Sequence, residues 1–298
     1  MLARRRWLRG RDRVLRFFAN PDTHPSEPFE TAFFGLTYAG NLNNFIDWTA
    51  FYYGAFALNE LRLLADLAAG LRARGGPVNF FDVGANIGHH SLFMSRHADR
   101  IFSFEPFLVV RDEMKRKFDR AGVVNATIFP VALGDSNGSA SFHPPTGANQ
   151  GTGTLGEILP DNASTDVITV QVARGDDFFA NNGLPPVSLL KMDVEGFEEQ
   201  ALEGLRHTLQ RDRPPILMEI QPDGRTGSGQ SSHMLSLLYP DHRIFRVEDI
   251  RGNYRLSPSK LSRSEEVLVL PAELAGIIPG TESPAAVTGP QSHLVAAR

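Results

Sequence analysis

Apolar and polar residues alternate along the central part of the chain with two different periods. Short apolar runs predict buried strands at 78–83, 101–105, 126–131, 187–192 and 216–221. Longer stretches of mixed polarity lie between them and predict helices at 89–97, 108–120 and 197–210. Alternation of short strands with helices is typical of βαβ units. The pattern therefore predicts an α/β fold with a doubly wound, mostly parallel sheet and helices on both faces.

Two regions depart from this alternation. Residues 29–71 are rich in aromatic side chains and end in leucines at helical spacing, which predicts an amphipathic helix that begins near Leu58 and stops at Gly70. Between Ser136 and Val172 the helical period gives way to Gly, Thr, Ser and Asn. This composition predicts a hairpin and a long loop in place of a third crossover helix.

The end of the pattern sets the predicted domain boundaries. A helix ending at Tyr239 and strands near 243–247 and 265–270 complete the α/β region. From Gly280 the chain is rich in Pro, Ala, Thr and Gly, so we expect a disordered tail. The predicted parts are a basic arm with a helical N-terminal extension, one α/β domain and the tail, at 1–72, 73–272 and 273–298.

Composition narrows the classes of function. The chain has 30 basic and 34 acidic residues, and this net charge of -4 gives no general attraction to nucleic acid, so we expect no nucleic-acid partner. The absence of cysteine excludes disulfides, thiolate zinc sites and cysteine nucleophiles, and it is typical of a reducing compartment. The sequence shows no apolar run of bilayer-spanning length and no secretory signal pattern. We therefore expect a cytoplasmic protein.

The first 18 residues depart from this overall charge. They hold seven arginines and a single acid, Asp12, together with several apolar residues that fit one side of a helix. The simpler interpretation is a solvated leader that frays. The alternative is a peripheral helix that contacts a membrane surface or a protein partner.

The stretch Phe80-Phe-Asp82-Val-Gly84-Ala-Asn86-Ile-Gly88 is an apolar strand that leads into a glycine loop and a helix. Glycines permit positive φ angles and close approach of a ligand, and a helix N-terminus offers unpaired N–H groups. Nicotinamide enzymes carry a similar loop. Two features favour S-adenosyl-L-methionine (SAM) instead: Asp82 suits a cationic ligand, and Asn86 replaces the second glycine of the dinucleotide fingerprint.

Acidic residues follow two further predicted strands. Glu105 ends the second strand, where a carboxylate can accept hydrogen bonds from the ribose diol of an adenosine cofactor. Asp193 and Glu195 follow the fourth strand. Ligands of open α/β sheets bind outside the carboxyl ends of the strands, so we expect all three acids to face the same cleft as the glycine loop.

Four elements together resemble the FkbM family of SAM-dependent methyltransferases: Asp82–Gly88, Phe104-Glu-Pro106, Ala132-Leu-Gly-Asp135 and Lys191-Met-Asp-Val-Glu-Gly-Phe-Glu198. The resemblance implies a class I, Rossmann-like methyltransferase fold with a seven-stranded sheet whose last strand is antiparallel. It also implies that the α/β domain binds SAM and transfers its methyl group to a hydroxyl oxygen on a polyketide, a sugar or a lipid-linked glycan.

The same resemblance implies roles for individual residues. The group around the methionine end of SAM comprises Asp82, Gly84, Asn86 and Gly88. Glu105 would bind the ribose, and Asp135 would bind the adenine amino group. From its place after the fourth strand, and not from the resemblance, we also expect Asp193 to contact the cofactor. For Asp135 the alternative is a turn residue in Gly134-Asp-Ser-Asn-Gly138.

An alcohol is a weak nucleophile until it loses its proton, so a general base is expected in the cleft. Our assignment is Asp193 for positioning and Glu195 for proton removal, with His89, His90 and Glu219 as further candidates. His89, at a predicted helix start, has capping or packing as its alternative role. Asp193, Glu195 and Glu219 together have an alternative role as a Mg²⁺ site.

Two other classes of function stay open at this point. The first is an NAD-dependent oxidoreductase on a similar sheet, and the second is a non-catalytic SAM-fold binding protein that docks through its basic arm. For the methyltransferase, the acceptor would be a small molecule or a glycan with a free hydroxyl. N-methylation and protein methylation are not excluded by the sequence.

Overall fold

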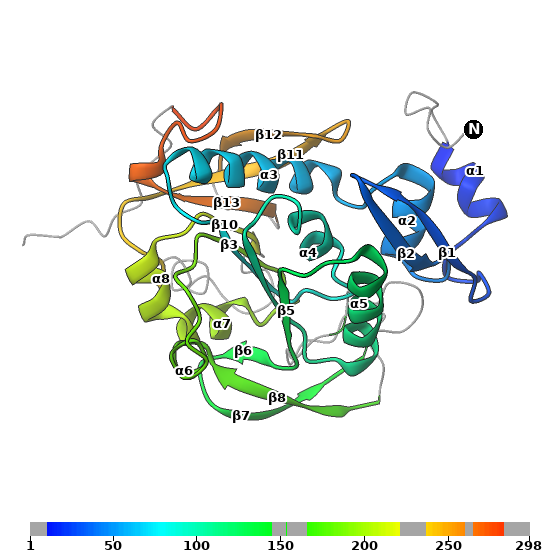
Figure 1. Ribbon diagram of the computed structural model, residues 1–298, viewed down its shortest axis with the longest axis horizontal. Helices are drawn as coiled ribbons and strands as arrows, with labels where there is room; N and C mark the ends of the chain where they lie inside the picture. The colour runs from blue at the N-terminus through cyan, green and yellow to red at the C-terminus, as the bar shows by residue number, and fades with distance from the viewer. Residues whose placement is uncertain (1–10, 145–152, 154–165, 221–236, 260–264, 283–298) are drawn as a thin grey trace, which may run out of the picture.

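The structure is a computed structural model that describes residues 11–144, 153, 166–220, 237–259 and 265–282. Its centre is an eight-stranded sheet in the order β12-β11-β13-β10-β9-β3-β4-β5 (Figure 1). The strands are β3 (Asn79–Val83), β4 (Arg100–Phe104), β5 (Ala126–Phe129), β9 (Leu189–Met192), β10 (Ile216–Ile220), β11 (His242–Ile250), β12 (Asn253–Pro258) and β13 (Glu265–Pro271). The five strands from β5 to β10 are parallel.

The last strand in the described part of the chain, β13, is antiparallel to both of its neighbours, as expected. The expected strand number was too low, because β12 adds an eighth strand at the edge beside β11. The five predicted parallel strands are confirmed, with ends that differ by one or two residues. The predicted helix ending at Tyr239 falls mostly outside the described residues.

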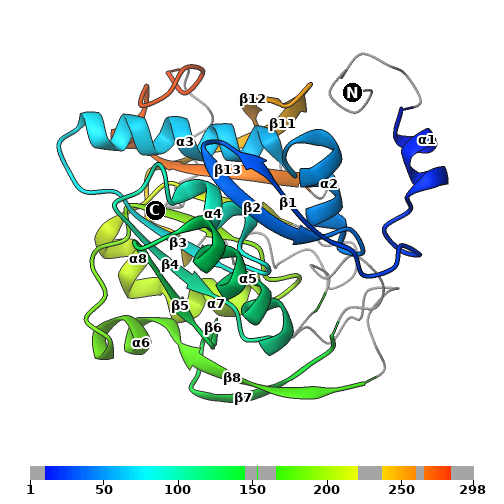
Figure 2. The ribbon, with the colours of Figure 1, turned by 45° about the vertical axis from the view of Figure 1, so that its right-hand side comes forward.

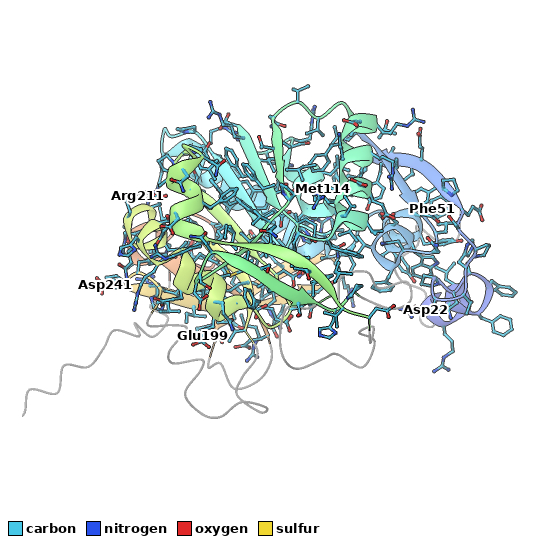
Figure 3. The ribbon with its side chains drawn as sticks, turned by 90° about the horizontal axis from the view of Figure 1, so that it is seen from below. Asp22, Phe51, Met114, Glu199, Arg211 and Asp241 are labelled. Atoms are coloured by element: carbon cyan, nitrogen blue, oxygen red, sulfur yellow. The ribbon has the colours of Figure 1, made fainter. Side chains whose placement is uncertain are left out.

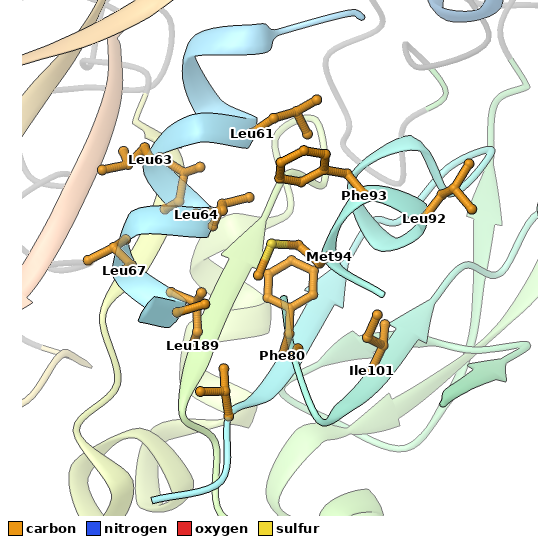
Figure 4. Packing of buried hydrophobic residues seen from close by; sticks show 14 of the residues in the cluster. Leu61, Leu63, Leu64, Leu67, Phe80, Leu92, Phe93, Met94, Ile101 and Leu189 are labelled. Carbon is orange, nitrogen blue, oxygen red and sulfur yellow. The ribbon is translucent and has the colours of Figure 1, made fainter. Parts of the chain in front are cut away.

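Helices cover both faces of the sheet. One face carries α3 (Leu58–Ala73), α4 (His89–Met94) and α5 (Leu108–Ala121), and the other carries α6 (Gly175–Asn181), α7 (Glu198–Gly204) and α8 (Arg206–Asp212). Neighbouring residues of one strand point to opposite faces. Phe80 therefore packs with Leu64 and Met94 (Figure 4), whereas Phe81 packs with Phe179 on the other side. Two apolar cores enclose the sheet.

Three predictions about helices and the tail need correction. The predicted helix 197–210 is two short helices, because the backbone leaves helical geometry at Leu205. The predicted tail boundary at 272 is too early, since a short 3₁₀ helix η3 (Ala272–Leu274) follows β13 and both Ile278 and Thr281 are buried. The rest of the tail, 283–298, lies outside the described residues.

The N-terminal extension was expected to be helical, but its described part begins with α1 (Arg11–Phe18) and then forms a β-hairpin. The hairpin strands are β1 (Pro28–Phe33) and β2 (Leu36–Asn41), and α2 (Phe45–Tyr53) follows them (Figure 2). Phe34 and Gly35 form the two-residue turn with φ angles of 49° and 81°. Two successive positive φ angles are typical of the turn that matches strand twist in a hairpin.

A buried polar cluster joins this extension to the sheet domain. Lys117 Nζ of α5 lies 2.6 Å from Asp47 Oδ1 of α2, and the Tyr38 hydroxyl of β2 donates to the same oxygen at 2.8 Å. Lys117 also lies 3.9 Å from the centre of the Tyr38 ring. All three side chains are buried. Removal of one member would leave a buried charge without its partner, so the cluster fixes how the extension lies on α5.

The predicted hairpin after Ser136 is confirmed. Strands β7 (Gly138–Phe142) and β8 (Ile168–Arg174) pair antiparallel, and β6 (Ala132–Gly134) joins β8 in a small three-stranded sheet. Most of the predicted loop between them lies outside the described residues. Within the described ranges, none of the helices combines the length and the hydropathy that crossing a lipid bilayer requires.

Candidate active site

A cleft lies where β3, β4 and β9 end at their carboxyl ends, which is where open α/β sheets bind ligands. It encloses about 990 Å³ of empty space, the part open to solvent included. The predicted site residues that line it are Gly84, Asn86, Glu105, Asp193 and Glu195.

The turns after β3 and β9 touch each other at Gly84. A Cβ atom on Gly84 would lie 1.8 Å from the Asp193 carbonyl oxygen, and Gly84 has a φ of +81°. The Asp193 amide also donates to the Val83 carbonyl at 2.9 Å. The glycine is therefore required for contact between two turns of the chain, a role that the sequence did not suggest. This contact brings the turn after β3 and the acidic turn after β9 into one cleft.

Gly84→Ala is expected to destabilise the fold by about 3 kcal/mol or more, because it adds both backbone strain and a clash with main-chain atoms. Gly183→Ala is the matched control: Gly183 also has a positive φ of +58°, but a Cβ there meets nothing within 4 Å. Chemical denaturation of the two variants measures the difference. Equal losses of unfolding free energy would contradict the contact.

Glu105 is held by the glycine loop and by the turn after β4. Its Oε2 accepts the Asn86 amide at 2.9 Å, and its Oε1 accepts the Phe107 amide at 2.8 Å. Asn86 has a φ of 51°, a conformation that asparagine tolerates better than most residues. Burial raises the pKa of Glu105 to about 7, although the two backbone amides oppose the shift. The carboxylate thus lines the cleft in a fixed orientation.

Asp193 and Glu195 differ in their electrostatic surroundings. Lys191 Nζ lies 3.0 Å from Asp193 Oδ2. Loss of solvation raises the pKa of Asp193, but its side chain is 47% exposed and the ion pair outweighs this effect, so the pKa lies below its usual range. Burial, with the charges of Asp193 and Glu219, raises the pKa of Glu195 to about 8. Near neutral pH the cleft therefore holds one ionised acid beside one that is mostly protonated.

Asp82 and Gly88 support the loop from behind and do not line the cleft. Asp82 is buried, and its Oδ2 accepts the Ser91 hydroxyl of α4 at 2.6 Å, whereas Oδ1 has no hydrogen-bond partner within the described part of the chain. A Cβ on Gly88 would lie 2.4 Å from Met114 of α5. Met114 lies inside the body of the molecule (Figure 3). Gly88 therefore serves packing between helices.

His89 does not face the cleft, which corrects its assignment as a candidate base. Its Nε2 lies 3.1 Å from the Phe56 carbonyl oxygen, and its Nδ1 lies 3.1 Å from the Tyr38 hydroxyl. Burial lowers the pKa of His89 well below its usual value. Both nitrogens already have partners in the contact with the N-terminal extension. His90 likewise pairs with Glu60 at 3.1 Å and does not line the cleft.

Asp135 is exposed, and its Oδ1 accepts the neighbouring Ser136 hydroxyl at 2.9 Å. The cleft is lined instead by Ala132 and Leu133 just before it. The turn interpretation therefore fits better than the adenine contact. We expect Asp135→Asn to change the dissociation constant for SAM by less than about twofold, as for surface substitutions generally. A tenfold loss in a calorimetric titration would restore the adenine assignment.

Several cleft residues were not identified from the sequence. Phe45 and Ile46 of α2 and Phe56 before α3 form one wall, and Phe107 and Phe142 contribute elsewhere. The signal was the density of aromatic residues before residue 71, which predicted no particular fold or role. The extension is thus part of the site, because it supplies apolar side chains that exclude water.

The alternative of a Mg²⁺ site gains no support from the arrangement of side chains. Glu219 lies on β10, in register with Glu266 of β13. Within the described ranges, no group of three His, Asp or Glu side chains is placed to hold a metal ion. We propose no metal-dependent step.

A family model and several curated proteins that are similar to this chain all point to the same family of methyltransferases. The model of the Methyltransferase FkbM domain matches residues 82–247, more than half of the chain. Hexuronic acid methyltransferase AglP of Haloferax volcanii is 32% identical over 132 residues, 44% of this chain and 51% of that protein. The 31-O-demethyl-FK506 methyltransferase FkbM of Streptomyces tacrolimicus is 30% identical over 171 residues, 47% of this chain and 63% of that protein.

A third relative, 2-O-methyltransferase NoeI of Sinorhizobium fredii, is 27% identical over 147 residues, 44% of this chain and 59% of that protein. The chain thus spans between about half and just under two thirds of the length of these relatives. Among solved structures, Methyltransferase FkbM from Methylobacillus flagellatus is 18% identical with a TM-score of 0.41, over 65% of this chain and 43% of that one. The match to residues 82–247 shows that this chain belongs to the FkbM methyltransferase family.

Proposed function

We propose that the chain is a SAM-dependent O-methyltransferase that acts on a hydroxyl group of a small-molecule or glycan acceptor. The observation that carries this proposal is the contact between the turns after β3 and β9, which brings Asp193 and Glu195 into one cleft with the glycine loop that holds Glu105. Membership of a methyltransferase family supports the reaction class. The names of three relatives support oxygen as the acceptor atom, since they refer to hexuronic acid, to 2-O-methylation and to 31-O-demethyl-FK506.

The residues in the cleft fit SAM as the methyl donor. Glu105 can accept hydrogen bonds from a ribose diol, since its two oxygens each use one lone pair on a backbone amide and keep another. Two carboxylates, Asp82 and Asp193, stand against one ammonium, Lys191, at these strand ends, and this negative balance suits a ligand with ammonium and sulfonium charges. The Asp82 oxygen without a partner in the described chain is consistent with this polarity. Ala132 and Leu133 would flank an adenine ring.

Bound SAM would supply an electrophilic methyl group on its sulfonium. The chain's own contribution is alignment and proton removal. Asp193, ionised and held by Lys191, positions the acceptor hydroxyl. Glu195 accepts the hydroxyl proton, and its pKa of about 8 is close to the value that suits a base at neutral to mildly alkaline pH. The phenylalanines of the wall keep water away from the reacting oxygen.

The proposal is tested with the full chain in two steps. Calorimetric titration with SAM and with NAD side by side should give heat with SAM alone. Incubation with methyl-labelled SAM and fractionated small molecules and glycans should then move label into hydroxylated compounds. Asp135→Asn serves as a control variant outside the cleft. Binding of NAD in place of SAM would overturn the proposal, and SAM binding without transfer to any hydroxylated fraction would point to a non-catalytic binding protein.

A further inference from the structure

Helix α1 ends in two phenylalanines that it presents to solvent. Phe17 and Phe18 expose 81% and 80% of their surfaces. Arg16, in contrast, lies over the rings of Phe45 and Trp48 of α2, at 5.3 and 5.9 Å from their centres. A surface helix ordinarily turns its apolar stripe toward the core. In α1 a charged residue faces the body, and the adjacent phenylalanines face away from it.

The helix is nevertheless fixed to the body. The Trp48 indole N–H donates to the Ala19 carbonyl just beyond the end of α1 at 2.6 Å. The rings of Phe17 and Phe18 contact each other edge to face, with 5.0 Å between their centres. Figures 1 and 2 both show α1 at the side of the molecule next to α2. The two phenyl rings are therefore presented together by an anchored element.

The charge of this segment is opposite to that of the rest of the chain. Residues 1–18 contain seven arginines and one aspartate, which leaves 23 basic and 33 acidic residues out of the totals of 30 and 34. Arg13 of α1 is exposed. An anionic surface would attract this segment and repel the remainder, so only one side of the molecule would approach it. Arginines interleaved with exposed aromatic residues are typical of helices that lie in a lipid interface.

We propose that α1 docks the chain onto an anionic lipid surface. Phe17 and Phe18 enter the interface, and Arg13 contacts the headgroups. The position of α1 adds a consequence, because Phe45 both contacts Arg16 and lines the cleft. Docking through α1 brings that wall of the cleft close to the membrane surface. The site would then be placed to reach acceptors carried by a lipid.

The test measures binding of the full chain to sedimented vesicles. Vesicles of phosphatidylcholine alone should not bind it, whereas vesicles that also contain phosphatidylglycerol should, with weakening at high salt. The double variant Phe17→Ser/Phe18→Ser should weaken binding at least about tenfold, because each ring loses its apolar burial. Arg13→Gln should weaken it about fivefold, the usual effect of one cationic residue near an anionic surface.

Two control variants lie elsewhere on the surface. Val124→Ser removes another apolar side chain, one that is 96% exposed, and Arg100→Gln removes an exposed arginine of β4. Neither should change vesicle binding, and thermal unfolding should match in all variants. Absence of binding to the mixed vesicles, or equal losses in the control variants, would overturn the proposal. The proposal would also be overturned if the chain bound duplex DNA more tightly than vesicles, in a salt-dependent way, and if Phe17→Ser/Phe18→Ser left that DNA binding unchanged. The measurement needs neither SAM nor acceptor, so its failure is distinct from failure of the methyltransferase proposal.

Discussion

Glu195→Gln is expected to lower the rate of methyl transfer about 100- to 10,000-fold, the usual contribution of a general base. Glutamine keeps the size of the side chain but cannot accept a proton. The dissociation constant for SAM should stay within about threefold, because the proposed role of Glu195 is toward the acceptor. Single-turnover rates and calorimetric titrations of the same preparation separate the two effects.

The role of Glu195 as a base also predicts how the rate of methyl transfer changes with pH. Burial raises the pKa of Glu195 to about 8, so the carboxylate form becomes abundant only as the pH approaches that value. The wild-type rate should therefore rise with pH and level off above about 8, and this rise should be absent in Glu195→Gln. Glu199→Gln is the matched control, since Glu199 lies in the first turn of α7, four residues after Glu195, and is not among the residues that line the cleft. A pH-rate profile that is unchanged by Glu195→Gln would remove Glu195 as the base.

The free energy of unfolding should also depend on pH through Glu195. The folded protein holds the Glu195 proton more tightly than the unfolded chain does, since the folded pKa of about 8 exceeds the ordinary value of 4.5. The stabilising contribution is therefore complete below the ordinary value and is lost as the pH rises toward 8. Glu195→Gln should abolish this loss. A low rate in this variant thus cannot be ascribed to unfolding at alkaline pH.

Glu105→Ala is expected to weaken SAM binding about 100-fold or more, because each charge-assisted hydrogen bond to the ribose contributes about 1.5–3 kcal/mol. In the wild-type chain the affinity should rise with pH through about 7, the pKa to which burial raises this carboxyl, since only the ionised form accepts two strong hydrogen bonds. The measurement is a calorimetric titration at several pH values. Loss of this pH dependence in Glu105→Ala distinguishes ribose binding from a purely structural role.

A structural effect of this variant must be separated from the binding effect. Glu105 also accepts the amides of Asn86 and Phe107, so alanine leaves two donors to be satisfied by water. Glu105→Gln keeps the shape and one carbonyl oxygen, and it should retain more of the unfolding free energy than alanine while still losing the pH dependence. If Glu105→Gln binds SAM as tightly as the wild type at all pH values, the carboxylate does not hold the ribose.

The two turns at the centre of the site show what could be predicted and where prediction stopped. Placement of Glu105, Asp193 and Glu195 at one edge followed from the apolar strands that precede them, because parallel strands end at the same edge. The role of Gly84 did not follow. The atom that forbids a side chain there is the carbonyl oxygen of Asp193, more than a hundred residues away. Sequence spacing carries no information about such a contact.

His89, Asp135 and the aromatic residues before residue 71 illustrate the same limit. The composition of Gly134-Asp-Ser-Asn-Gly138 allowed a turn or a ligand contact, and only the exposed position of Asp135 separated the two. His89 has its two partners, Tyr38 and Phe56, in the N-terminal extension. The hairpin of that extension depends on the Phe34-Gly35 turn. Neither residue type at the turn is specific enough to predict a hairpin by itself.

The sequence alone determined where the parallel strands lie along the chain and which acidic residues follow them. Periodicity and turn composition depend on residues that are close in the chain, so the sequence carries both. The tertiary structure decided which of those residues share a cleft, that α2 supplies one of its walls, and which of two neighbouring acids keeps its proton. These properties depend on burial and on distances between groups far apart in sequence. The pKa values of Asp193 and Glu195 are set by Lys191, Glu219 and the depth of the cleft, which exist only after the chain has folded.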